Sequence, residues 1–126
     1  MKKILFIITT ILMLFSCSNK HELNMDRAAL FYERGEYENA MLEYKNVINN
    51  YPSDITLLDN NAIHMLANAH HNLAVIHLKR SYETEDPIEI SSYLEQANYE
   101  AQTAYYLYPM DVYKSTLDSI KRAINS

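Results

Sequence analysis

Glycine and cysteine are nearly absent from this chain, and tryptophan is missing altogether. Gly35 is the only glycine and Cys17 the only cysteine among 126 residues. A single cysteine excludes an intramolecular disulfide, and a single glycine excludes the glycine-rich loops that bind phosphate groups. There are also only three prolines. Since so little interrupts regular secondary structure, the composition favours a chain built of long helices.

Basic residues are scarce as well. The chain has 11 Lys and Arg against 16 Asp and Glu, which gives a net charge of −5 with neutral histidines. Lys2 and Lys3 lie in a segment that we expect to be removed, and without them nine basic residues remain against 16 acidic ones, a net charge of −7. This balance argues against nucleic-acid partners and against binding to anionic lipid headgroups by charge.

Residues 1–16 have the pattern of an export signal. Lys2 and Lys3 precede an apolar run over 4–15 that only two threonines interrupt. The run is shorter than the about 20 apolar residues that a membrane-spanning helix needs, and it fits the apolar region of a secretory signal. The alternative is an ordinary signal peptide or a short uncleaved anchor with an incidental cysteine.

Cys17 follows this run directly, because residues 14–17 are Leu-Phe-Ser-Cys. The pattern resembles the processing site of bacterial lipoproteins, and the resemblance implies cleavage before Cys17 and lipidation of its thiol. Acyl chains contribute about 0.8 kcal/mol per buried methylene, so two or three would hold the protein on a membrane durably. The serine after the cysteine, Ser18, resembles lipoproteins sent to the outer membrane, since the common retention signal at that position is an aspartate. Residues 17–21 would form a short polar tether, and no cofactor besides the lipid is expected.

The clearest helix pattern lies between Gly35 and Pro52. Its apolar residues are one, three or four positions apart, which places them on one face of an α-helix. They are Tyr37, Ala40, Met41, Tyr44, Val47, Ile48 and Tyr51. Pro52 marks the end of the helix. We expect Gly35 to adopt a turn conformation that other residues disfavour, so that Gly35→Ala costs more than about 1 kcal/mol.

Four further helices are predicted by the same periodicity, so that the fold class is all-α. They cover 22–34, 54–81 with Asp54 as N-cap, 88–108, and 111–124 with Asp111 as N-cap. The first should bury Met25, Ala28, Ala29, Phe31 and Tyr32, and the last should bury Val112, Leu117, Ile120 and Ile124. The acidic connector over 81–87 is the best candidate for a mobile loop. Residues 22–126 would then form one domain of two helix hairpins and a C-terminal capping helix.

A repeated skeleton links the two hairpins. Two sets of residues have identical internal spacing, namely Ala40, Tyr44, Val47 and Pro52, and Ala97, Ala101, Ala104 and Pro109. Repeated helical units usually stack into a solenoid, because one unit cannot bury its own apolar face. The Gly-x-Tyr-x-x-Ala pattern at 35–40, together with the terminal proline, resembles the tetratricopeptide repeat. The resemblance implies an α-solenoid of two such repeats with a concave surface formed by the first helix of each pair.

That resemblance also implies which side chains meet a partner. The matching positions are Met25, Ala29, Tyr32 and Glu33 in the first pair, and Asn68, His71, Val75, Leu78 and Lys79 in the second. The alternative is that these side chains pack on one another. The residues that some members use to clamp a C-terminal carboxylate are not reproduced in the first repeat, so we do not expect that ligand. Two repeats are fewer than the three usually needed, which favours an obligate partner.

Catalytic and metal-binding residues are not predicted. Four of the five histidines fall in two pairs, His64 with His71 and His70 with His77, each seven residues apart. Seven residues span roughly 10 Å along a helix, which is too far for one zinc ion. The acidic residues over 83–89 lack the spacing of an EF-hand loop. We therefore expect no enzyme activity.

Residues 33–54 narrow the family further. Their sequence resembles repeats of the lipoprotein subunit of the outer-membrane β-barrel assembly machine, the BamD-like family, in shortened form. The resemblance implies a scaffold anchored by lipid in the outer membrane, facing the periplasm, that binds another envelope protein such as the channel subunit of that machine. The alternatives are an adaptor lipoprotein of another envelope machine, for secretion or cell-wall synthesis, and a solute- or metal-binding lipoprotein.

Overall fold

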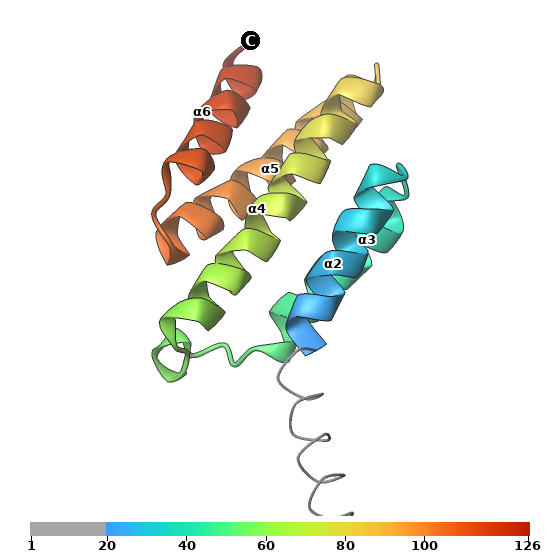
Figure 1. Cartoon of the computed structure of the whole chain (residues 1–126). Helices are drawn as coiled ribbons and strands as arrows, with labels where there is room; N and C mark the ends of the chain where they lie inside the picture. The colour runs from blue at the N-terminus through green and yellow to red at the C-terminus, as the bar shows by residue number, and fades with distance from the viewer. Residues whose placement is uncertain (1–19) are drawn as a thin grey trace, which may run out of the picture.

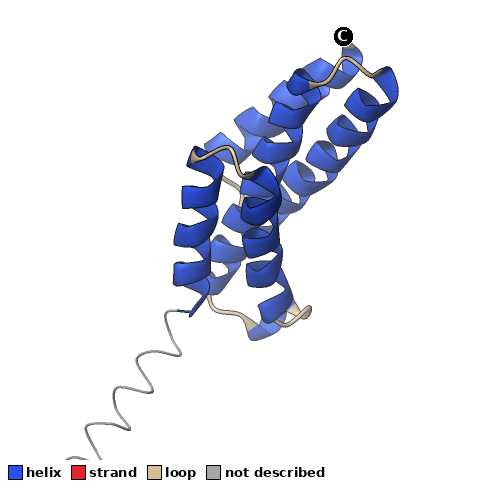
Figure 2. Cartoon of the chain, turned by 90° about the vertical axis from the view of Figure 1, so that its right-hand side faces the viewer, coloured by secondary structure: helices blue, strands red, loops and turns tan. Residues whose placement is uncertain are grey.

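The computed structural model describes residues 20–126. Its helices are α2 (Lys20–Glu33), α3 (Tyr37–Asn50), α4 (Asn60–Glu83), α5 (Pro87–Leu107) and α6 (Asp111–Asn125), with a short 3-10 turn, η1 (Ile55–Leu57), before α4. This part of the chain contains no strand, and short loops join its helices (Figure 2). The all-α prediction is confirmed. The predicted signal peptide and the lipidated cysteine lie outside the described residues.

The helices form two hairpins and a terminal helix, as predicted. α2 pairs with α3 and α4 pairs with α5, while α6 packs on the second hairpin. Figure 1 shows α2, α4 and α6 on the near side, with α3 and α5 behind them. The first hairpin contacts the second mainly through α3 and α4, so the described chain stacks like a helical repeat. Within residues 20–126, no helix combines the length and the apolar composition that crossing a bilayer requires.

Alanines let the helices approach closely. Ala74 of α4 and Ala97 and Ala101 of α5 are fully buried in one cluster with Leu117 and Ile120 of α6. A second cluster joins α4 and α5 through further alanines and brings in Tyr113. Because an alanine adds little volume, the helix backbones can come near and the longer side chains of α6 fill the remaining space. The seam between α4, α5 and α6 is therefore a closely packed apolar core.

The repeated skeleton occupies equivalent places in the two hairpins. Ala40, Tyr44 and Val47 are buried in α3, and Ala97, Ala101 and Ala104 are buried in α5. Each set lies on the second helix of its hairpin and clusters with buried residues of the first helix and of the helix that follows. The identical spacing that the sequence shows thus corresponds to the same packing role in three dimensions.

Gly35 ends α2 in the conformation that the sequence predicts. Its φ is +74°, in the left-handed region. The backbone N–H of Gly35 donates to the carbonyl of Tyr32, and that of Glu36 donates to the carbonyl of Phe31. These two hydrogen bonds form a Schellman motif, which satisfies carbonyl groups at the end of the helix. A Cβ added at Gly35 would have no neighbour within 4 Å, so the cost of a side chain there is confined to the backbone.

Several predicted boundaries are wrong. α2 begins at Lys20, two residues before the predicted start, so the last two residues of the predicted tether at 17–21 are helical. Asp54 does not cap the long helix, because its side chain accepts from the Thr56 N–H and begins η1. Asp59 caps α4 instead, accepting from the Ala62 N–H at 2.8 Å. The predicted continuous helix is interrupted because two nearby aspartates each bond the backbone that follows them.

The acidic connector is shorter than predicted. α4 continues to Glu83, so only residues 84–86 lie between the helices. Thr84 donates to Glu89 at 2.6 Å, and Asp86 accepts from the Ile88 N–H at 3.0 Å. These bonds hold a capped turn in place of the expected long loop.

The predicted buried faces of the first and last helices, α2 and α6, need correction. Ala29 in α2 is exposed, and in α6 Val112 and Ile124 are 50% and 47% exposed. Tyr113, which was not predicted to be buried, is 2% exposed. Asp111 is the first helical residue and caps nothing, since Met110 holds the N-cap position. The buried face of α6 differs from the predicted one because α6 packs on both α4 and α5. That face is wider than the predicted stripe of aliphatic residues and is rotated from it.

His77 is the largest polar side chain in the core. It is 4% exposed, and its Nδ1 atom has no hydrogen-bond partner among the described residues. Its ring lies near Tyr93, with centroids 6.5 Å apart. Burial lowers the pKa of His77, and the positive charges of Lys45 and Arg80 act in the same direction, against the carboxylates of Glu100 and Glu38. The neutral form therefore predominates in the folded protein.

We expect Gly35→Ala to lower the free energy of unfolding by about 1–2 kcal/mol, the cost of a left-handed backbone for a residue with a Cβ. Gly35→Asn should cost less, because asparagine tolerates that region better. Urea denaturation followed by circular dichroism measures both. An alanine variant as stable as the parent would contradict this account of the turn.

Acidification should destabilise the protein through His77. Its folded pKa lies below the unfolded value of about 6.5, so below that pH the unfolded chain takes up a proton that the folded chain resists. Stability is then complete at neutral pH and falls as the pH drops, by at most about 1.4 kcal/mol per pH unit for one histidine. Urea denaturation from pH 7.5 to 5 should show a shallower loss in His77→Leu. Equal slopes in the two proteins would contradict the prediction.

Candidate functional site

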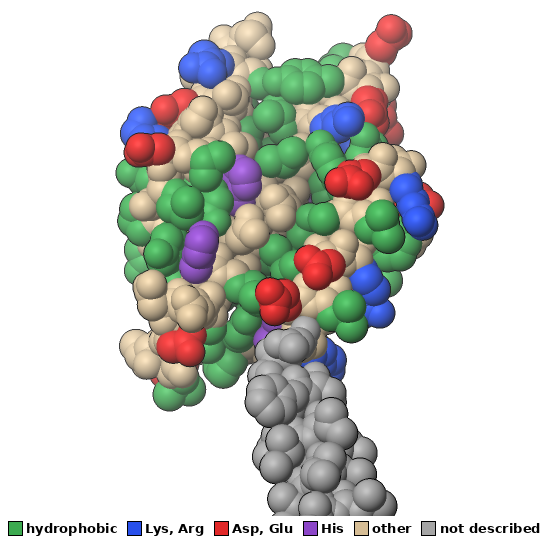
Figure 3. Space-filling model, viewed as in Figure 1, with side chains coloured by type: hydrophobic (Ala, Val, Ile, Leu, Met, Phe, Trp, Pro, Cys, Tyr) green, Lys and Arg blue, Asp and Glu red, His purple; other side chains and the backbone are tan. Residues whose placement is uncertain are grey.

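An open groove separates α2 from α4 on the face formed by the first helices. Its volume is about 350 Å³. We call it the inner groove and define it by its lining residues, which are Glu22, Met25, Asn61, His64, Met65 and Asn68. Figure 3 shows this face, with acidic side chains on the α2 side and histidines on the α4 side. The groove exists because the contact between the hairpins is made by α3 rather than by α2.

Aromatic rings and one lysine join the two walls beyond one end of the groove. The Nζ atom of Lys79 on α4 lies 5.4 Å from the ring centroid of Tyr32 on α2 and 5.6 Å from that of Tyr37. The two tyrosine rings are themselves 5.7 Å apart. A cation above aromatic faces is attracted by the ring electrons. A side-chain hydrogen bond with Tyr37 is the main cause of the raised pKa of Lys79, so the ammonium group keeps its charge.

His71 connects α4 to α6. Its Nε2 atom lies 2.7 Å from the Thr116 hydroxyl oxygen, and its ring centroid is 4.8 Å from that of Tyr113. The Thr116 hydroxyl also donates to the carbonyl of Val112, at 3.2 Å. Burial lowers the pKa of His71. Burial therefore favours the neutral imidazole, and its hydrogen bond with Thr116 joins α4 to α6.

His64 marks the other end of the same face. It lines the inner groove, and its ring stacks on Tyr108 with centroids 4.4 Å apart. Tyr108 lies between α5 and α6. His64 and His71 thus each contact a tyrosine ring, that of Tyr108 and that of Tyr113 respectively. These contacts fix the position of α4, which forms one wall of the groove.

The nine predicted partner-binding residues divide into four groups. Met25 and Asn68 line the inner groove, and Tyr32 and Lys79 meet beyond its end. Ala29, Glu33 and Val75 are exposed or half-buried with no contact that defines a site. His71 and Leu78 face α6, where Leu78 packs against the buried cluster around Leu117. The structure therefore brings together about half of the predicted set.

Four groove residues were not predicted, although one signal pointed to two of them. Asn61 and His64 precede Asn68 by seven and four residues, which places them on its face of the helix. The sequence placed the start of the repeat too late to include them. Glu22 and Met65 lie on different helices, and only the packing of α2 beside α4 brings them together.

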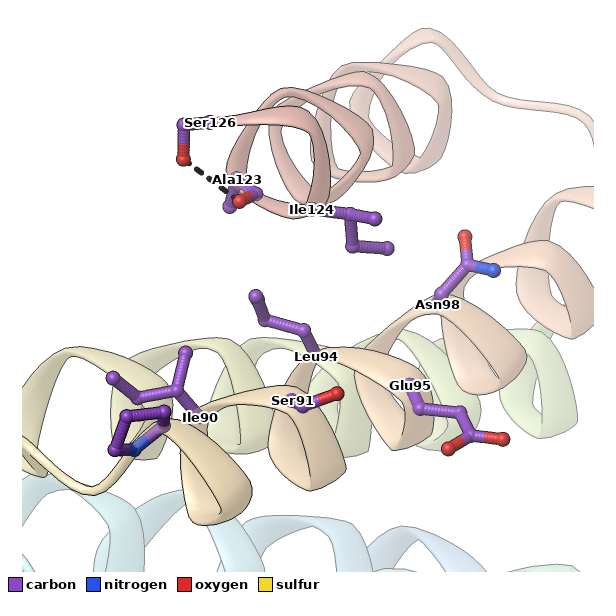
Figure 4. A pocket seen from close by; sticks show the side chains of 9 residues that line it. Ile90, Ser91, Leu94, Glu95, Asn98, Ala123, Ile124 and Ser126 are labelled. Carbon is purple, nitrogen blue, oxygen red and sulfur yellow. Dashed lines mark hydrogen bonds between the residues drawn. The ribbon is translucent and has the colours of Figure 1, made fainter.

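A second cavity lies between α5 and the end of α6, with a volume of about 550 Å³. Ile90 and Leu94 line one side and Ile124 points toward them from α6 (Figure 4). Asn98 also lines it, and its Oδ1 atom is buried without a hydrogen-bond partner among the described residues. The two helices diverge here, which explains why Ile124 is half exposed although its periodicity predicts burial.

The inner groove offers hydrogen-bonding groups and apolar groups together. Two amides, Asn61 and Asn68, offer donors and acceptors, while the thioethers of Met25 and Met65 offer adaptable apolar contacts. Between Lys20 and Ser126, no group of three His, Cys, Asp or Glu side chains is placed to hold a metal ion. The arrangement suits a polypeptide segment, which needs both hydrogen bonds and apolar contacts.

A scan against protein-family models finds no match for this chain, and searches of curated proteins and of solved structures find no similar protein. No relative therefore supplies a function for the inner groove.

We expect Thr116→Val to destabilise the protein by about 1 kcal/mol, because His71 loses its hydrogen-bond partner. Thr103→Val is the matched control. The Thr103 hydroxyl also donates to a carbonyl one turn earlier, that of Tyr99, but no second side chain bonds to it within the described residues. Chemical denaturation measures both variants. Equal losses in the two would show that the bond to His71 contributes nothing.

Proposed function

We propose that this protein is a lipid-anchored scaffold of the bacterial cell envelope that binds another envelope protein through its inner groove. Lipidation of Cys17 would attach it to the outer membrane with the helical domain facing the periplasm. Assembly of outer-membrane β-barrel proteins is the process that we assign to it. These assignments depend on the export pattern of residues 1–16, on the cysteine that follows, and on the resemblance over 33–54.

One observation supports the binding role above the others. The inner groove lies open between α2 and α4, lined by amide, imidazole and thioether side chains. Its wall along α4 is fixed by the contacts of His64 and His71 with Tyr108 and Tyr113. A preformed groove on rigid helices reduces the entropy that a partner loses on binding. Scaffold proteins of the helical-repeat class bind partners on such surfaces.

The test is affinity purification of the detergent-solubilised, lipidated protein, followed by mass spectrometry of the proteins that come with it. We expect a stoichiometric envelope protein, which Asn68→Arg should remove because the longer, charged side chain fills the groove. Asn49→Arg introduces the same change on the exposed surface of α3 and should retain the partner. Thermal melts of both variants ensure that neither change unfolds the domain.

The identity of the recovered protein separates the possible processes. A barrel-assembly channel subunit supports the assignment to barrel assembly, whereas a component of secretion or cell-wall synthesis would move the scaffold to that machine. Recovery of the lipidated protein alone, as a folded monomer, would contradict the scaffold function. A partner lost equally from the α3 control would contradict the role of the inner groove.

A further inference from the structure

Charge is segregated between the two sides of α2. Asp26 and Glu33 follow Glu22 by four and eleven residues, which places all three carboxylates on one side of the helix. Glu22 lines the inner groove, so this side borders the groove. We call these three residues the acidic rim. All three are exposed, and Figure 3 shows acidic side chains along α2 on this face.

The basic residues of α2 point elsewhere. Arg27 donates to Asn24 at 2.6 Å and to Glu43 of α3 at 3.3 Å. Lys20 falls on the same side of the helix as Arg27, since it is seven residues away, and Arg34 lies in the turn that follows α2. No positive charge of α2 therefore neutralises the acidic rim from within the helix.

The rim serves no evident role in folding. Within residues 20–126, none of its three carboxylates makes a hydrogen bond or an ion pair. Glu33 lies in the last turn of α2, where no basic residue is present, and a negative charge at that end of a helix is unfavourable. Local helix stability accounts for Glu22 in the first turn but not for Glu33.

The opposite wall does not balance this charge. α4 carries no carboxylate before Glu83, and its basic residue on the inner face is Lys79. Lys79 lies beyond the far end of the groove, over the rings of Tyr32 and Tyr37. The groove is therefore bordered by carboxylates on α2 and by the amide and imidazole side chains of Asn61, His64 and Asn68 on α4.

We infer that the inner groove binds a cationic, otherwise apolar segment of its partner protein. Lysine or arginine side chains of that segment pair with the acidic rim, while its apolar side chains contact Met25 and Met65. Asn61 and Asn68 hydrogen-bond its backbone. This inference rests on the proposed scaffold function and adds the chemistry of the partner. The charge on the rim sets the orientation of the segment and speeds its encounter with the groove.

The probe is a phage-displayed library of random peptides, selected against the full lipidated protein in detergent micelles. We expect the selected peptides to be enriched in lysine and arginine and to lose binding in Asn68→Arg. Fluorescence anisotropy then gives the dissociation constant of the tightest peptide for two triple variants. The rim variant is Glu22→Gln, Asp26→Asn and Glu33→Gln. The control carries the same substitutions away from the groove, at Glu85→Gln, Asp111→Asn and Glu95→Gln.

Loss of three exposed ion pairs should weaken binding about tenfold in the rim variant, whereas the control should change it less than about twofold. Higher salt should weaken binding to the parent more than to the rim variant, because exposed charges are screened. Peptides that depend on Asn68 but show no basic enrichment, or that bind the rim variant as tightly as the parent, would overturn the inference and leave the scaffold function intact. A library that yields no Asn68-dependent peptide would overturn both.

Discussion

The close approach of α4 and α5 through alanine side chains is the contact on which the rest of this structure depends. Ala74, Ala97 and Ala101 leave room for the larger side chains of α6, so three helices share one buried cluster. Close packing of this kind tolerates little change in volume. It holds α4 at a fixed distance from the helices on either side, and α4 in turn carries one wall of the inner groove.

The groove is a consequence of how the hairpins stack. The first hairpin contacts α4 through α3, and the buried cluster between them includes Tyr44, Val47, Leu73 and Ile76. α2 is therefore carried beside α4 without packing tightly against it. The space between them is bordered by the carboxylates of α2, and it ends where Lys79 meets the rings of Tyr32 and Tyr37. The stack thus presents an open surface whose negative charge is supplied by α2.

Much of the fold could be predicted from the sequence because helices are encoded locally. The stripe from Tyr37 to Tyr51, the turn at Gly35 and the repeated alanine skeleton all depend on neighbours within a few residues. The boundaries near Asp54 and Asp59 were harder, since either aspartate can cap a helix and only their combined geometry shows that both are used. The orientation of α6 could not be predicted, because it packs on two helices at once. Its buried side therefore includes Tyr113 and leaves Val112 and Ile124 half exposed.

The sequence by itself determined the helical class, the two hairpins and the buried face of α3. Those features follow from periodicity, which each segment carries independently of the others. Only the tertiary structure decided that Glu22 and Met25 lie opposite Asn61 and Asn68, and that His71 bonds to Thr116 in place of facing a partner. Such pairs join residues about 40 positions apart in the chain. Their proximity depends on the angle and spacing at which whole hairpins pack, and no local pattern records it.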